Sequence, residues 1–104
     1  MTITDIRIRK IIPEGRLRGV ISITIDGQFA VHDIKVVQGD ERMFVAMPSR
    51  KDDSGVFRDI VHPITPEARQ MIESEILSAF LAEIEAREAE AVESESEADK
   101  VEEV

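Results

Sequence analysis

Apolar and polar residues alternate along the first half of this chain, which is the pattern of half-buried β-strands. Turn residues interrupt the alternation at Pro13–Arg16, at Asp26-Gly27 and at Gln38–Glu41. Asp-Gly favours a two-residue hairpin turn, because both of its residues must accept positive φ. The pattern therefore predicts antiparallel strands over residues 6–12, 17–25, 28–37 and 44–47.

These turns also predict a register. A two-residue turn at Asp26-Gly27 places Ile25 opposite Gln28, Ile23 opposite Ala30 and Ile21 opposite His32. A four-residue first loop gives the pairs Ile12–Leu17, Ile8–Ile21 and Ile6–Ile23. One face then collects the apolar side chains of Ile6, Ile8, Ile12, Leu17, Ile21, Ile23, Ile25, Ala30, Ile34 and Val36. The other face carries Arg7, Arg9, Arg18, Asp33 and Lys35 beside Val20, Phe29 and Val31. We expect the first face to be core and the second to be partly covered by a second subunit.

A helix is predicted to start at Thr65-Pro66-Glu67. Threonine is a good N-cap, proline fits the first helical position, and glutamate suits the positive end of the helix dipole. An apolar stripe follows at Ile72, Ile76, Phe80 and Ile84, with Leu77 and Leu81 widening it. The sequence thus predicts an α+β fold, in which a small antiparallel sheet of four to five strands packs one face against a C-terminal helix. The stripe is wide enough for part of it to contact a partner chain.

The charge is divided unevenly along the chain. Residues 1–66 hold ten Lys/Arg and nine Asp/Glu, whereas residues 67–104 hold three Lys/Arg and thirteen Asp/Glu, so +1 and -10 make up the total of -9. From about Glu85 the sequence is mainly Ala, Glu and Ser. We therefore predict a single domain over residues 1–84 and an acidic, disordered tail over residues 85–104. The tail is read as solubilising, or alternatively as a mimic of nucleic acid that competes for a basic loop.

The segment 44–61 predicts a strand, a charged loop and another strand. Pro48 ends the first strand, since it has no N–H to donate. Residues 49–55 have turn chemistry and hold Arg50 and Lys51, while Arg58 lies just beyond them. Together with the nearby helix start, these cations are candidate phosphate ligands. A solvated loop tip is the alternative interpretation, because Asp52 and Asp53 partly cancel the field.

Other chemistry finds little support in the sequence. The chain has no cysteine, no apolar run that could cross a membrane and no signal peptide, so a cytoplasmic location is expected. His32 and Asp33 are adjacent on a strand and would point to opposite faces, and His62 is expected to bond a backbone carbonyl. We therefore expect that the protein is not an enzyme and that it binds no metal, cofactor or small-molecule substrate.

Several strings of residues resemble a known family. F-V-A-M-P-S-R-K and G-V-F-R-D-I-V-H-P-I, with T-D-I-R-I-R, G-R-L-R-G-V-I-S-I-T-I-D and F-A-V-H-D-I-K-V before them, are similar to the stage V sporulation protein G (SpoVG) family. The likeness covers residues 1 to about 81. It implies a dimeric bacterial regulator of sporulation, asymmetric septation and gene expression that binds DNA and RNA. It also implies nucleic-acid contacts at Arg50, Lys51 and Arg58. Where family members carry further basic residues, this chain has Asp52 and Asp53.

Two functions are therefore predicted. In the first, a homodimer presents two copies of the basic loop to DNA or RNA. In the second, the protein is an interaction module of the cell-division or sporulation machinery, and the helix stripe or the second sheet face docks a partner. The cation cluster separates the two functions, because only the first function needs it.

Overall fold

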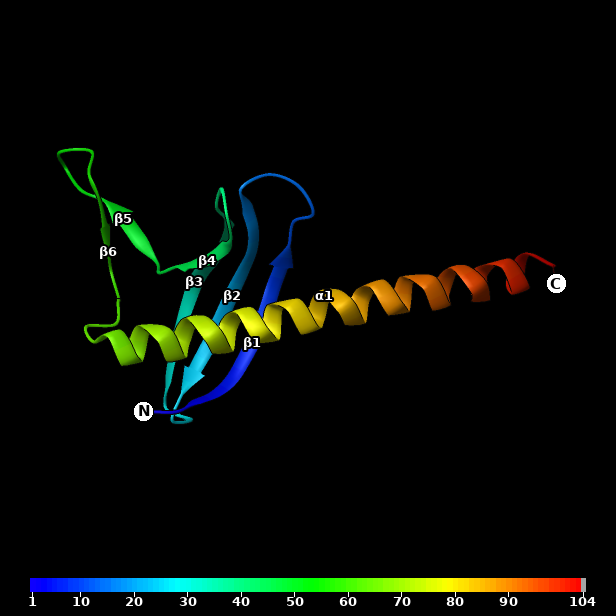
Figure 1. The fold of residues 1–104 in the computed structure, drawn as a ribbon, viewed down its shortest axis with the longest axis horizontal. Helices are drawn as coiled ribbons and strands as arrows, with labels where there is room; N and C mark the ends of the chain where they lie inside the picture. Colours follow the sequence, from blue (N-terminus) through cyan, green and yellow to red (C-terminus); the bar gives the residue numbers. More distant parts are fainter. Residues whose placement is uncertain (104) are drawn as a thin grey trace.

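A four-stranded antiparallel sheet and a long C-terminal helix make up most of the molecule, as the computed structural model shows (Figure 1). The structure describes residues 1–103, with side chains to residue 89. The sheet has the order β1-β2-β3-β4, and β5 and β6 form a separate two-stranded hairpin. The elements are β1 (Ile3–Ile11), β2 (Leu17–Ile25), β3 (Phe29–Gln38), β4 (Met43–Ala46), β5 (Ser49–Lys51), β6 (Phe57–Asp59) and α1 (Pro66–Glu103). The predicted α+β architecture is confirmed.

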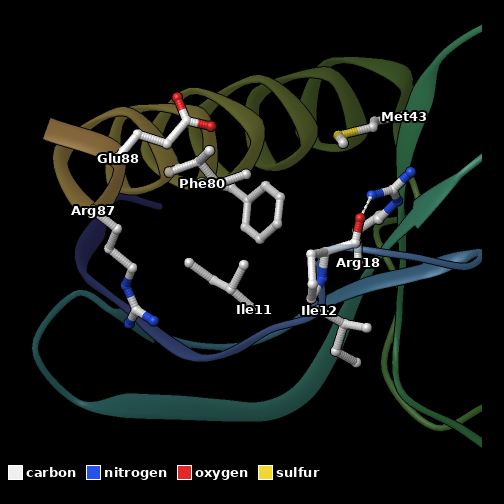
Figure 2. A pocket seen from close by; sticks show the side chains of 9 residues that line it. Ile11, Ile12, Arg18, Met43, Phe80, Arg87 and Glu88 are labelled. Atoms are coloured by element: carbon white, nitrogen blue, oxygen red, sulfur yellow. Dashed lines mark hydrogen bonds between the residues drawn. The ribbon is translucent and has the colours of Figure 1, made fainter. Parts of the chain in front are cut away.

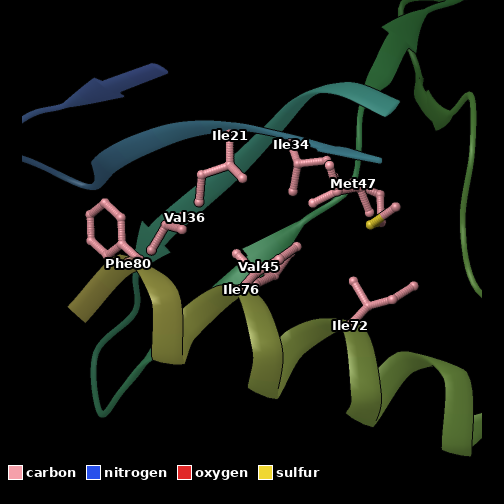
Figure 3. Close-up of a cluster of buried hydrophobic side chains, with 9 residues drawn as sticks. Ile21, Ile34, Val36, Val45, Met47, Ile72, Ile76 and Phe80 are labelled. Atoms are coloured by element: carbon pink, nitrogen blue, oxygen red, sulfur yellow. The ribbon is translucent and has the colours of Figure 1, made fainter. Parts of the chain in front are cut away.

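The core lies between α1 and one face of the sheet (Figure 3). The helix contributes Ile72, Ile76 and Phe80, as the apolar stripe predicted. The sheet side contributes Ile21, Ile23, Ile34, Val36, Val45 and Met47. Phe80 packs directly on Gly19, where a Cβ atom would run into the phenyl ring. Leu81 lies at the edge of the stripe and is 49% exposed, whereas Leu77 packs against the core.

The predicted register between β1 and β2 is correct at its centre. Ile6 lies opposite Ile23 and Ile8 opposite Ile21. The predicted Ile12–Leu17 pair is wrong: the N–H of Ile12 donates to the carbonyl of Arg18 at 2.8 Å, and Leu17 pairs with Val37 of β3. A register shift between Ile8 and Lys10 displaces the end of β1, and Leu17 is consequently 36% exposed rather than in the core.

The register between β2 and β3 differs from the prediction at the turn. Asp26 and Gly27 do have positive φ, 53° and 64°. However, Ile25 pairs with Phe29 instead of Gln28, so the loop has one more residue than a two-residue hairpin. The start of the chain holds this wider loop, because the amide of Thr2 donates to the Asp26 carboxylate at 2.8 Å and the amide of Asp26 donates to the Thr2 carbonyl at 2.7 Å.

A β-bulge in β3 shifts the register by one more residue, so that Ile34 and Val36 face the core. Ile23 pairs with Val31 and Ile21 pairs with Ile34, so two residues, His32 and Asp33, lie opposite a single one. Asp33 accommodates the extra residue with φ of 61°. The predicted pairs of Ile23 with Ala30 and of Ile21 with His32 are therefore wrong. Ala30 is exposed, and Val31, predicted on the second face, packs against the core.

The charged loop predicted at residues 49–55 is itself largely a hairpin. β4 ends at Ala46, and Ser49–Lys51 pairs with Phe57–Asp59 as β5 and β6, so the second predicted strand is shorter than residues 56–61. The chain leaves the main sheet at Pro48, whose carbonyl accepts the N–H of Ile60 at 2.8 Å. Figure 1 shows this hairpin projecting away from both the sheet and α1.

The helix begins as predicted. The hydroxyl of Thr65 accepts the N–H of Ala68 at 3.1 Å, which is the N-cap bond, and Pro66 is the first helical residue. The helix extends through Glu103 and therefore includes most of the predicted tail segment. The predicted disorder of the acidic tail falls mostly on residues 90–104, whose side chains lie outside the described residues, and it stays a prediction.

Candidate nucleic-acid interface

The hairpin formed by β5 and β6 carries all three candidate cations, Arg50, Lys51 and Arg58, and each of them is exposed. Arg50 lies directly opposite Arg58, whereas Lys51 lies opposite Phe57. Residues that face each other across an antiparallel pair are on the same side of the ribbon. The structure therefore brings the two arginines together on one side and places the lysine on the other.

Asp52 organises the turn of this hairpin. One of its carboxylate oxygens accepts the amides of Ser54 and Val56 at 2.9 and 3.0 Å, and the other accepts Nε of Arg58 at 2.8 Å. Its own backbone N–H donates to the carbonyl of Val56 at 2.9 Å. The Arg58 guanidinium, and after it the Val56 amide, lowers the pKa of Asp52 below its usual value. Asp52 thus stays ionised and directs its charge into the turn.

Arg58 is the one cation of the three that is held by an acidic neighbour within the part of the chain the structure describes. Its ion pair with Asp52 is solvent-exposed on the arginine side, and such pairs contribute little to stability. Arg50 and Lys51 make no ion pair among the described residues. Both therefore keep their charges available to a polyanion.

Lys51 is supported by an aromatic ring instead of a carboxylate. Its Nζ lies 5.9 Å from the centroid of the Phe57 ring, which is within the range of a cation–π interaction. The Phe57 side chain is itself 69% exposed. The contact holds the aliphatic stem of Lys51 along the hairpin, and a base could stack on the exposed ring beside it.

The net charge of the hairpin does not favour polyanions by itself. Residues 49–59 contain three cations and three carboxylates, those of Asp52, Asp53 and Asp59, so their formal charge is zero. What distinguishes the surface is arrangement, because Asp52 is turned inward while Arg50 and Lys51 point to solvent on opposite sides. The base of the hairpin leads to the start of α1, but its tip projects away from the helix N-terminus (Figure 1).

The two histidines have different roles. Nδ1 of His62 lies 3.2 Å from the carbonyl oxygen of Pro63, which confirms the predicted backbone contact. Nδ1 of His32 lies 2.9 Å from the hydroxyl of Ser22, which also accepts Nε of Arg9 at 3.3 Å. This contact could not be predicted from the sequence, because it depends on the bulge in β3. No hydrogen bond joins His32 to a carboxylate among the described residues.

Comparison with known proteins gives a clear match. The SpoVG family model covers residues 1–82, which include the whole sheet, the hairpin and the buried part of α1. The chain belongs to the SpoVG family. The resemblance noted in the sequence is thereby confirmed. The acidic tail of the chain lies beyond the matched segment. The predicted domain boundary at residue 84 stays a prediction.

Relatives of this SpoVG chain are named as septation proteins. One from Clostridium botulinum (strain Alaska E43 / Type E3) is 51% identical over 90 residues, covering 86% of this chain and 99% of the relative. One from Clostridium beijerinckii is 55% identical over 80 residues, covering 77% and 88%. One from Caldicellulosiruptor bescii is 48% identical over 88 residues, covering 85% and 100%. In the described residues of the SpoVG chain, α1 lacks a stretch with the length and apolarity that a membrane crossing requires.

Proposed function

We propose that this chain is a cytoplasmic regulator of septation and sporulation that binds DNA and RNA as a homodimer. The observation that carries the proposal is the exposed hairpin, on which Arg50 and Lys51 have no acidic partner among the described residues. The names of the relatives support the part of the proposal that concerns septation. No catalytic step is included in it.

The shape of the hairpin supports contact with a duplex. The major groove of B-DNA is about 12 Å wide and admits a two-stranded β-ribbon. A ribbon placed there would present Arg50 and Arg58 to one wall of phosphates and Lys51 to the other, because the register puts them on opposite sides. Single-stranded RNA would instead contact the cations through phosphates and the ring of Phe57 through a base.

Exposed apolar side chains next to the hairpin support a dimer. Ile60, Val61 and Ile64 are 63%, 43% and 87% exposed and follow one another closely along the chain. A small apolar cavity of about 230 Å³ lies beside Ile64, between the start of α1 and the sheet. Side chains of this size rarely stay in water as a group. A second copy that covers them would also place two basic hairpins in one assembly.

The same apolar residues support the second candidate function, an interaction module for a protein of the division machinery. Docking at Ile60, Val61 and Ile64 would not require Arg50 or Lys51. The two functions therefore predict opposite outcomes when only the cations are removed.

The test is an electrophoretic mobility titration of Arg50→Ala/Lys51→Ala with DNA and RNA at several salt concentrations. We expect binding of the wild-type protein to weaken steeply with salt, and the double variant to lose most of it at an unchanged melting temperature. Arg7→Ala/Lys10→Ala, which removes two exposed cations from β1, is the matched control and should bind like wild type. Equal binding by the hairpin variant and wild type would rule out this interface. Light scattering that gives a monomer mass at micromolar concentration would rule out the dimer.

A further inference from the structure

A second hollow lies at the other end of the sheet, where α1 separates from it. Its volume is about 360 Å³, and it is bounded by the end of β1, the loop that follows, the start of β2, β4 and the helix (Figure 2). Cavities of this size accommodate small organic ligands. It shares no lining residue with the candidate interface.

The lining of this cavity is mainly apolar, and its charged residues are Arg18, Arg87 and Glu88. Ile11 and Ile12 line it from β1 and the following loop, Met43 from β4, and Phe80 and Ile84 from α1. Figure 2 shows Ile11 and Phe80 facing the hollow from the sheet side and the helix side. Phe80 is fully buried, whereas Ile84 is only partly buried although it belongs to the helix stripe. The core therefore stops one helical turn before the stripe does, and apolar surface is left uncovered.

One buried polar group in the lining has no partner. Nε of Arg18 is inaccessible to solvent and makes no hydrogen bond with the described residues, while another nitrogen of the same guanidinium donates to the carbonyl of Pro13. A guanidinium stays charged inside a protein, so it cannot avoid the cost of this unused donor by losing a proton. An occupant that brings an acceptor would remove that cost, and a carboxylate is the acceptor that pairs best with a guanidinium.

We propose that this cavity binds a small amphiphilic carboxylate, with its hydrocarbon part against Ile11, Phe80 and Ile84 and its carboxylate on the Arg18 guanidinium. The occupant would fill the space between α1 and the end of β1. It would thereby extend the contact of the helix with the sheet beyond Phe80. This site is independent of the proposed nucleic-acid interface, and either proposal can fail without the other.

The test uses the full-length protein and octanoate as probe, with amide chemical shifts followed by NMR. We expect saturable shifts at Ile11, Met43 and Ile84, and weaker binding of 1-octanol. Ile84→Trp fills the cavity and should abolish the shifts, while Leu81→Trp, an equal change at an exposed position of the same helix, should leave them unchanged.

A second variant tests the polar contact. Arg18→Met should weaken octanoate by about tenfold to a hundredfold, the range for a hydrogen bond to a charged group, and leave 1-octanol unaffected. The proposal fails if octanoate gives no saturable shift, if Ile84→Trp binds as wild type does, or if octanol and octanoate bind equally. It also fails if the lining amides shift with protein concentration in the absence of probe, because a second copy then occupies the cavity.

Discussion

Replacing Gly19 with alanine tests the contact on which the helix is seated. An added Cβ would overlap Cε1 of Phe80, and it would lie 3.1 Å from Cζ of the same ring and 3.2 Å from the Lys10 carbonyl oxygen. The backbone of Gly19 needs no positive φ, since its conformation is that of an ordinary strand residue. The perturbation is therefore one of packing and not of backbone strain.

The expected loss follows from two opposing effects. Overpacking by one methyl group in a well-packed core costs about 1–3 kcal/mol. Replacing glycine in a compatible conformation recovers about 0.4–1 kcal/mol, because the unfolded chain loses conformational freedom. A net loss of about 1–2 kcal/mol follows, and each kcal/mol lowers the melting temperature of a domain of this size by about 4–8 °C.

The assay is urea denaturation followed by circular dichroism, applied as a double-mutant cycle with Phe80→Leu. Leucine removes both ring atoms that the new Cβ would meet, and only the Lys10 contact remains, which a small shift relieves. We expect Gly19→Ala to cost about 1–2 kcal/mol in the wild-type background and close to nothing beside Leu at position 80. An equal cost in both backgrounds would show that the phenyl ring does not rest on Gly19.

Two further predictions concern the hairpin turn and the bulge. The pKa of Asp52 is lowered in the folded protein, so its contribution to the stability of the turn is complete above its unfolded pKa and is lost as the pH falls through the lowered folded pKa. The NMR amide shifts of Ser54 and Val56 should titrate together in that acidic range. Titration of these amides near neutral pH would contradict the assignment. Asp33 has φ of 61°, so Asp33→Gly should stabilise the protein by up to about 1 kcal/mol and Asp33→Ala should destabilise it, which thermal unfolding of both variants would measure; equal melting temperatures would refute the bulge.

The candidate site was only partly readable from the sequence. Turn residues and neighbouring cations are local features, so Arg50, Lys51 and Arg58 could be assigned to one projecting segment. Their division between the two sides of a ribbon could not, because it depends on which residues pair across β5 and β6. The role of Asp52 was also missed. Its charge counts against nucleic-acid binding in the sequence, but in the structure it holds Arg58 and the turn amides.

The cavity beside Arg18 had no sequence signal either. An apolar stripe shows which residues of a helix are able to pack, but it does not show where the sheet beneath them ends. Ile84 continues the stripe, and only the divergence of α1 from β1 leaves it facing a hollow.

Taken alone, the sequence determined the main elements and most of the faces they bury: the alternation of β1 and β2, the N-cap at Thr65 and the apolar stripe of the helix. These elements and faces follow from the two-residue period of a strand, the 3.6-residue period of a helix and hydrogen bonds between residues close in the sequence. The tertiary structure decided the pairing of β3. The bulge at Asp33 places Ile34 and Val36 under the helix, and hydrogen bonds with Thr2 hold the wider turn. This register depends on contacts between residues far apart along the chain, so it cannot be predicted from a local sequence pattern.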